Sequence, residues 1–432
     1  MAKKFDTTQK SLISVYIFRI ILELFTTTFL TSYILTLSPD TVLGSGILNI
    51  GIFYISMYAT YALLYFTISF FVDKSNRVSF LRIGILVTTL LLIALIFYGE
   101  LISHWIVLAG ALCGISDAFF YSSYLVMRNE LNSRKSLKKY NLLAYVFTNV
   151  VKIIVPIILG YLLDITSFAH MSIYFLLLAV IQFGLTCLIK SNKPKDAKFE
   201  IKKFLKYLKR NPEVRSKIKY TYLNAFTAGF KSTYKVIVTI LTIYTFKTNF
   251  SLGIFTSIFS LTTMLLLMIY KKFDHNPKLN KFATYLILGI VPFILCIVLV
   301  IDLNVVTLVI YNLFLTIAIG FSDYFGTVER DAIIKNVGKY EYIAEHQFCI
   351  ELIMCSTRIL SYGIFILIGL LSNIIAFKIL LVVLLLINPI KFMIMYKQRL
   401  IRKEFEDKQK AEALNNIPAE LPVNPEPAST EL

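Results

Sequence analysis

The sequence lacks most of the short motifs by which ATP-driven pumps and soluble enzymes are recognised. It has no Gly-x-x-x-x-Gly-Lys-Ser/Thr loop, which argues against a primary pump, and no His-Glu-x-x-His of a zinc protease. The five cysteines form neither a Cys-x-x-Cys pair nor a cluster with histidine at metal-ligand spacing, so we expect no disulfide, no metal site and no cofactor. Only 16% of the residues are charged, compared with about 25% in soluble domains.

Apolar residues take the place of the missing charge. They make up 57% of the chain, the mean hydropathy is +0.71, and long apolar runs recur along the sequence. The chain is therefore predicted to be an all-α membrane protein that crosses the bilayer many times. Its net charge of +18 could suggest a nucleic-acid partner, but most Lys and Arg lie in short hydrophilic segments that alternate with segments nearly free of them. That alternation follows the positive-inside rule, so we expect no nucleic acid.

The alternation predicts twelve membrane-spanning helices with both termini in the cytoplasm. The expected spans are 11–37, 45–72, 80–98, 102–127, 141–163, 169–190, 220–246, 250–270, 282–301, 304–328, 341–371 and 374–396. The predicted domains are a cytoplasmic N-terminus (1–10), a six-helix bundle (11–190), a basic linker (191–219), a second six-helix bundle (220–396) and a cytoplasmic tail (397–432). The first apolar run is too long for a signal peptide, so we expect it to stay as an uncleaved span.

The basic linker is expected to contain an amphipathic helix, because Ile201, Phe204, Leu205 and Leu208 share one face of a helix among basic residues. Such a helix either lies on the anionic inner leaflet or only ties the two bundles together. The tail is expected to begin as a charged helix and to end in a disordered run rich in Pro, Ala and Glu.

The two halves of the chain repeat one plan. Three short segments recur at offsets of 200 to 206 residues: Gly114-Ile-Ser-Asp117 and Gly320-Phe-Ser-Asp323, Lys139-Tyr140 and Lys339-Tyr340, and Phe71-Val-Asp73 and Lys272-Phe-Asp274. Such self-similarity indicates a duplicated architecture.

Ionisable residues are expected deep inside several spans, where an unpaired charge is costly unless it faces water. The cations are Arg19, Lys152, Lys231, Lys235 and Arg358, and the anions are Glu23, Asp117, Asp323 and Glu351. Arg19 and Glu23 are one helical turn apart, as are Lys231 and Lys235, so each pair shares a helix face.

The excess of cations favours an anionic or zwitterionic substrate, with the five cations as its ligands. The four carboxylates are candidates to carry a coupling proton, because a cavity of low dielectric favours their neutral form. The alternative is that these residues form interhelical salt bridges that only set the packing and the gates.

One loop motif points to a family. The segment Ser69-Phe-Phe-Val-Asp73-Lys74-Ser-Asn76-Arg77 resembles the Gly-x-x-x-Asp-Arg-x-Gly-Arg loop of the major facilitator superfamily, with both glycines replaced. Together with twelve spans in two halves, it makes the chain similar to a bacterial, twelve-span member. The resemblance implies two pseudo-symmetric six-helix bundles whose spans 1, 4, 7 and 10 line a central cavity. It also implies a cytoplasmic gate at Asp73, Lys74 and Arg77, and at Asp274 in the second half.

The leading hypothesis is a secondary transporter that moves a small anionic or zwitterionic solute by alternating access, coupled to protons, as a monomer in the cytoplasmic membrane. A proton-coupled exporter of drugs or lipids is the rival, in which Glu23 and Asp117 would serve lipophilic cations; a lipid flippase is a variant of it. A membrane sensor that does not transport is the third hypothesis. The Gly-x-Ser-Asp segments are only partly similar to the Gly-x-Gly-Asp of membrane aspartyl proteases, so we expect no enzymatic activity.

Overall fold

The computed structural model describes residues 5–37, 45–71, 76–130, 134–190, 199–246, 248–273, 280–336, 342–371 and 374–415. Within these ranges the chain forms helices and no strand. The predicted gate residues Asp73, Lys74 and Asp274 lie outside the described residues, as does the tail beyond residue 415.

The helices of the first half are α1 (Thr7–Glu23), η1 (Leu24–Phe29), α2 (Leu30–Thr36), α3 (Ser45–Ser69), α4 (Arg77–Tyr98), η2 (Gly99–His104), α5 (Ile106–Glu130), α6 (Arg134–Ile165) and α7 (Phe168–Thr186). Those of the second half are α8 (Ile201–Arg210), α9 (Pro212–Phe246), α10 (Asn249–Phe273), α11 (Lys281–Ile301), α12 (Val305–Asn336), α13 (Ile343–Leu370), α14 (Ile374–Leu385) and α15 (Ile387–Asn415).

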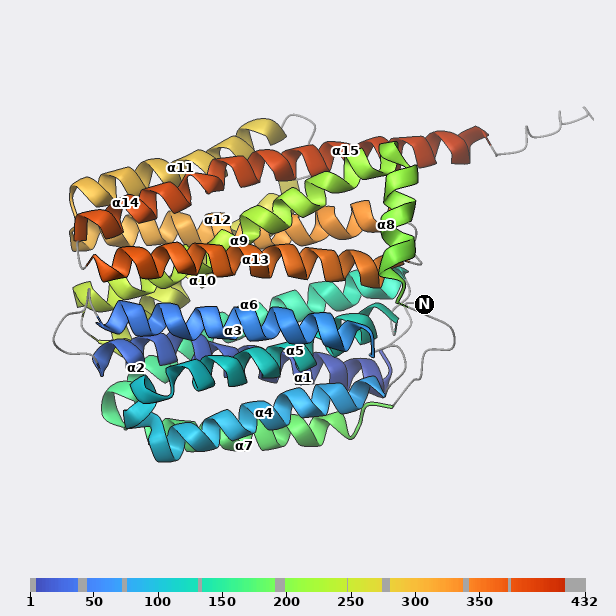
Figure 1. Cartoon of the computed structure of the whole chain (residues 1–432). Helices are drawn as coiled ribbons and strands as arrows, with labels where there is room; N and C mark the ends of the chain where they lie inside the picture. Colours follow the sequence, from blue (N-terminus) through green and yellow to red (C-terminus); the bar gives the residue numbers. More distant parts are fainter. Residues whose placement is uncertain are drawn as a thin grey trace, which may run out of the picture.

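The long helices run side by side in two bundles, α1 to α7 in the first and α9 to α15 in the second (Figure 1). The N-terminus and the end of α15 lie at one end of the molecule, which we call the termini end; the other is the opposite end (Figure 1). The bundles meet along two pairs of helices, α3 with α13 and α6 with α10. The predicted all-α fold of two six-helix bundles is confirmed.

Eleven helical segments of the described chain are long and apolar enough to cross a membrane. α9 is the twelfth long helix; Lys231 and Lys235 lower its hydropathy. Four helices, α6, α9, α12 and α15, extend well past the expected spans at the termini end, and α1, α4, α5 and α10 extend past them by a few residues. The helices are longer than the expected spans there because hydropathy marks where the chain leaves the bilayer, whereas the local backbone hydrogen bonds of a helix continue into water.

The opposite end is closed by direct contacts between α6 and α10. The Asp164 carboxylate, near the end of α6, accepts hydrogen bonds from the backbone N–H groups of Asn249 and Phe250, at 3.1 and 2.9 Å. The helices cross so closely that a Cβ atom on Gly253 would lie 2.2 Å from the carbonyl oxygen of Pro156. Nearer the middle of the molecule, the rings of Tyr54 and Tyr362 stack across the bundles with centroids 4.7 Å apart. Together these contacts join the two bundles in the opposite half of the molecule.

The short helix α8 lies across the termini end (Figure 1). Phe204 and Leu208 are buried in a cluster that includes Ile218 and Ile333, whereas Leu205 is 53% exposed. The backbone N–H of Glu200, just before α8, donates a 2.7 Å hydrogen bond to the Glu345 carboxylate at the start of α13. Part of the apolar face of α8 is thus covered by the second bundle.

Candidate functional site

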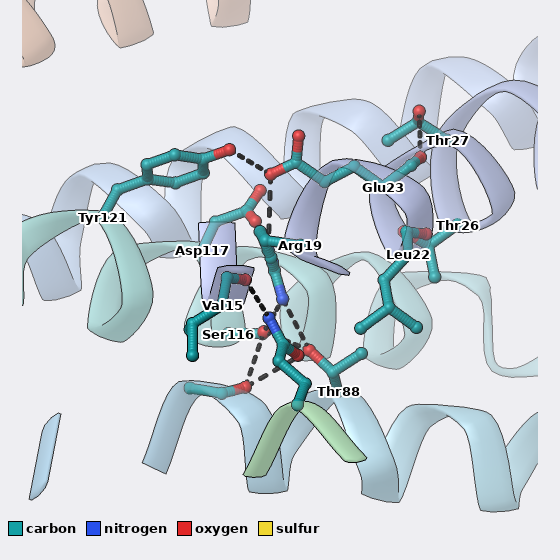
Figure 2. Close-up of polar contacts among 12 residues, drawn as sticks. Val15, Arg19, Leu22, Glu23, Thr26, Thr27, Thr88, Ser116, Asp117 and Tyr121 are labelled. Atoms are coloured by element: carbon teal, nitrogen blue, oxygen red, sulfur yellow. Dashed lines mark hydrogen bonds and ion pairs between the residues drawn. The ribbon is translucent and has the colours of Figure 1, made fainter. Parts of the chain in front are cut away.

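The predicted intramembrane charges gather in three groups. The first lies within the first bundle, where α1 carries Arg19 and Glu23 and α5 carries Asp117 (Figure 2). The Arg19 guanidinium forms ion pairs with Glu23, at 3.3 Å, and with Asp117. We call these three residues, with Tyr121 of α5, the acidic cluster, because two carboxylates face one guanidinium.

Every nitrogen of the Arg19 guanidinium has a partner. In addition to the two carboxylates, Nη1 donates to Thr88 Oγ1 of α4 at 2.7 Å and to Ser116 Oγ of α5 at 2.9 Å. The guanidinium also lies 5.2 Å from the centre of the Phe120 ring, within cation–π range. Arg19 therefore holds α1, α4 and α5 together and sets the position of both carboxylates, with each of its three guanidinium nitrogens engaged by a protein group.

Glu23 differs from Asp117 in its exposure. Its side chain is 26% exposed, whereas that of Asp117 is 11% exposed. One Glu23 carboxylate oxygen accepts hydrogen bonds from Arg19 and from the Tyr121 hydroxyl, and the other makes no contact with the residues drawn in Figure 2. Glu23 therefore offers the accessible carboxylate oxygen of the acidic cluster.

A π-helical turn, η1, begins directly after Glu23. Within it the hydroxyls of Thr26 and Thr27 donate to the carbonyl oxygens of Leu22 and Glu23, at 3.1 and 2.6 Å. Bonds of this kind often bend helices, and π turns are frequent at functional sites. The run of three threonines is the signal in the sequence from which this feature could have been predicted.

The second group surrounds Asp323 of α12. Lys231 of α9 forms an ion pair with it at 2.5 Å, and the charges of Lys152, Lys235 and Lys391 act on the same carboxylate. We call these four lysines with Asp323 the lysine cluster. It draws on α6 of the first bundle and on α9, α12 and α15 of the second.

Three members of the lysine cluster have no ionic partner. Lys152, Lys235 and Lys391 make no hydrogen bond or ion pair with any other described residue. Lys391 is only 4% exposed, yet sequence reasoning missed it. The signal in the sequence is Asn388-Pro-Ile-Lys391, in which two polar residues interrupt an apolar run. Lys391 lies close to the expected end of the last span, so it resembles a charge that flanks the membrane.

The space beside the lysine cluster is accessible. The Asp323 side chain is 39% exposed and Lys235 is also exposed, although both lie in the middle of long helices and interact with charges from several neighbouring helices. The exposure of both side chains indicates a solvent-accessible space beside them at this depth. Lys152 comes from α6 of the first bundle and lies near enough to Glu23 and Asp323 for their charges to act on it.

The two clusters are related by the duplication. In each bundle a cation of the first long helix pairs with the aspartate of a Gly-x-Ser-Asp segment, Arg19 with Asp117 and Lys231 with Asp323. One turn further along, the halves differ, because Glu23 stands where the second half has Lys235. The acidic cluster of the first bundle therefore has an excess of negative charge, and the lysine cluster has an excess of positive charge.

The third group lies where α3 and α13 meet. The Arg358 guanidinium lies 4.7 Å from the centre of the Tyr58 ring, and the Tyr61 hydroxyl donates to Glu351 at 3.2 Å. Gln347 donates to the other Glu351 oxygen at 2.9 Å. These contacts join the bundles and engage Arg358 and Glu351 with residues of α3 and α13.

Of the predicted gate residues, Arg77 is the one within the described range. It is buried at the first position of α4, and its backbone carbonyl accepts a hydrogen bond from the Ser123 hydroxyl of α5. A separate cavity of about 820 Å³ lies at the opposite end of the first bundle, lined by Tyr33, Glu100 and Phe168 among others. It is remote from the charged clusters.

Comparison with known proteins adds the family and the fold. A sequence model of the major facilitator superfamily matches residues 15–328. A crystal structure of a POT family transporter in complex with a thioalcohol-conjugated peptide is similar with a TM-score of 0.64 and 14% identity, over 89% of this chain and 96% of the other. A second, in complex with 5-aminolevulinic acid, has a TM-score of 0.63 and 15% identity over the same shares. Curated protein sequences give no significant match.

Proposed function

The chain belongs to the major facilitator superfamily and is a membrane transporter, not an enzyme; on that premise we propose that it is a secondary active transporter of a small anionic or zwitterionic solute. The solute would bind between the two bundles, which would expose it alternately to either side of the cytoplasmic membrane. By the positive-inside rule the termini end faces the cytoplasm.

One observation carries the choice of substrate: Lys235 is unpaired and accessible in the middle of the bundle. An unpaired ammonium group at that depth is costly unless water or a ligand solvates it. An anionic group bound at Lys235 would supply the missing partner.

The acidic cluster makes a zwitterion a natural occupant. An ammonium group could bind the accessible oxygen of Glu23 while the acidic group binds Lys235, with Lys152 between the two. One of the similar solved structures holds 5-aminolevulinic acid, an amino acid, in agreement with this reading. The substrate-binding role of Arg19 would then be indirect, since each of its guanidinium nitrogens is engaged by a protein group, and that of Arg358 stays a prediction.

We further propose proton coupling through the carboxylates Glu23, Asp117, Asp323 and Glu351. Glu23 and Asp323 have the more accessible side chains of the two clusters and are the first candidates to exchange a proton with solvent. The gate at Asp73, Lys74, Arg77 and Asp274 and the monomeric state stay predictions.

The test is a thermal-shift panel on the purified protein with amino acids, carboxylates, phosphorylated metabolites and lipophilic cations. We expect an anion or zwitterion to stabilise the wild type and Lys378→Met but not Lys235→Met. Lys378 is a matched control, because its Nζ donates to the Val300 carbonyl, far from the clusters. Stabilisation by lipophilic cations alone, abolished by Glu23→Gln, would contradict the proposal and support the drug exporter.

A further inference from the structure

The lysine cluster holds more positive charge than its surroundings neutralise. Four lysines face one carboxylate, and Asp323 is already engaged by Lys231. Three ammonium groups are left without an ionic partner among the described residues. A folded chain keeps such an excess in a membrane only if water or an anion compensates for it.

The three unpaired lysines surround Asp323 from different helices, since the charge of each acts on that carboxylate. Lys152 comes from α6, Lys235 from α9 and Lys391 from α15, so they approach from three helices and from both bundles. Lys391 is almost fully buried, whereas Lys235 is exposed to the accessible space. The cluster therefore has a closed side and an open side.

The chemistry of the donors selects the kind of anion. Planar carboxylates are best matched by the fork of an arginine, whereas a lysine ammonium is a compact charge that imposes no planar geometry. A carboxylate would also neutralise only one of the three charges. A phosphate monoester carries close to two negative charges at neutral pH and presents three terminal oxygens, one for each lysine.

We propose that the lysine cluster binds the phosphate monoester group of a ligand, held by Lys152, Lys235 and Lys391. Lys231 neutralises Asp323 by its ion pair, so the aspartate does not repel the phosphate. The inference deepens the proposed function by naming the acidic group of the solute, and it rests on that function only for transport. Binding can be tested without transport.

The experiment measures binding to the full-length protein in nanodiscs with three probes: inorganic phosphate, glycerol 3-phosphate and phosphatidic acid. Acetate at equal ionic strength serves as the monoanion control. The small probes are titrated by calorimetry, and phosphatidic acid is scored as stabilisation over phosphatidylcholine nanodiscs. Binding of glycerol 3-phosphate without an effect of phosphatidic acid identifies a soluble ester, and the reverse identifies a lipid.

We expect Lys235→Met and Lys391→Met each to raise the dissociation constant of the bound phosphate probe by about tenfold or more. Each substitution weakens binding because it removes one charged hydrogen-bond donor. Lys378→Met should bind as the wild type does. Without ligand, Lys391→Met should melt no lower than the wild type, since it removes repulsion, and this shows that the variant folds.

Phosphate binding that is unchanged in Lys391→Met, or the absence of binding by all three probes, would overturn the inference. Stabilisation by amino acids in the same preparation would then leave the proposed function standing, whereas no stabilisation by any solute would count against both.

Discussion

Arg19 is the residue on which the centre of the first bundle depends. Its guanidinium binds Asp117, Glu23, Thr88 and Ser116, so each partner is fixed by the same group. A buried cation with this set of partners is stable, but removal of one anionic partner leaves an uncompensated charge. The two carboxylates are nevertheless not equivalent.

Asp117→Asn is expected to destabilise the protein more than Glu23→Gln. Asp117 is the more buried of the two, and breaking a buried ion pair costs about 3 to 5 kcal/mol. Glu23 is partly accessible, so water can replace part of its interaction with Arg19. Melting temperatures of both variants in one detergent check the order, with Asp302→Asn at the exposed end of α11 as the control. Equal losses in the two variants would contradict the assignment of roles.

At this scale the sequence predicted much of the chemistry but not the pairing. The spacing of Arg19 and Glu23 and the repeat at Asp117 and Asp323 singled out residues that form ion pairs in the structure, because an ionisable group in an apolar run is visible in the sequence. The pairing of Arg19 with Asp117 joins residues 98 positions apart. It depends on how α1 and α5 pack, which periodicity does not encode.

Among the helices, α8 is the element whose role the sequence left open. Its pattern fits equally a helix on a membrane surface and one packed on protein, because both require one apolar face. The structure distinguishes the members of that face: Phe204 is buried beside His346, with ring centroids 4.5 Å apart, while Leu205 is exposed. Sequence could not predict this, since the surface that covers Phe204 comes from α9, α12 and α13.

Phe204→Ala should release α8 from the second bundle, whereas Leu205→Ala should not. The buried ring is the main apolar contact of a ten-residue helix, and such a short helix is not stable alone. The four lysines of α8 make limited trypsin digestion a direct readout. Cleavage in α8 should be about tenfold faster in Phe204→Ala than in the wild type, because local opening sets the rate. Equal rates in the two variants would show that the docking is unimportant.

The whole molecule consists of two similar bundles with unlike centres. The duplication preserved the ion pair between the first helix and the Gly-x-Ser-Asp segment in each half, and the halves diverged one turn further along, at Glu23 and Lys235. The fold followed from the sequence because twelve apolar runs with alternating basic connections allow few arrangements. The conformational state of the molecule did not follow from the sequence. It depends on the end at which the two bundles touch each other.

The contacts at the opposite end predict from which side the central space can be reached. Ser32 of α2 donates a 2.6 Å hydrogen bond to the Asn249 side chain of α10, and Asp164 binds the same turn. A short thiol cross-linker between Ser32→Cys and Asn249→Cys should therefore hold the opposite end closed. In that state a Lys235→Cys thiol should react with a membrane-impermeant anionic reagent added at the termini end, and not with reagent added at the other side.

Labelling is measured in membrane vesicles of both orientations, so that the reagent reaches the protein from either side. The cross-linked protein with Lys235 intact gives the background labelling of the native cysteines. Before cross-linking, a protein that alternates should be labelled from both sides, because each conformation exposes the central space in turn. Labelling from the opposite side with the cross-link in place would show that these contacts are not the seal. Labelling from one side only, with or without the cross-link, would contradict alternating access itself.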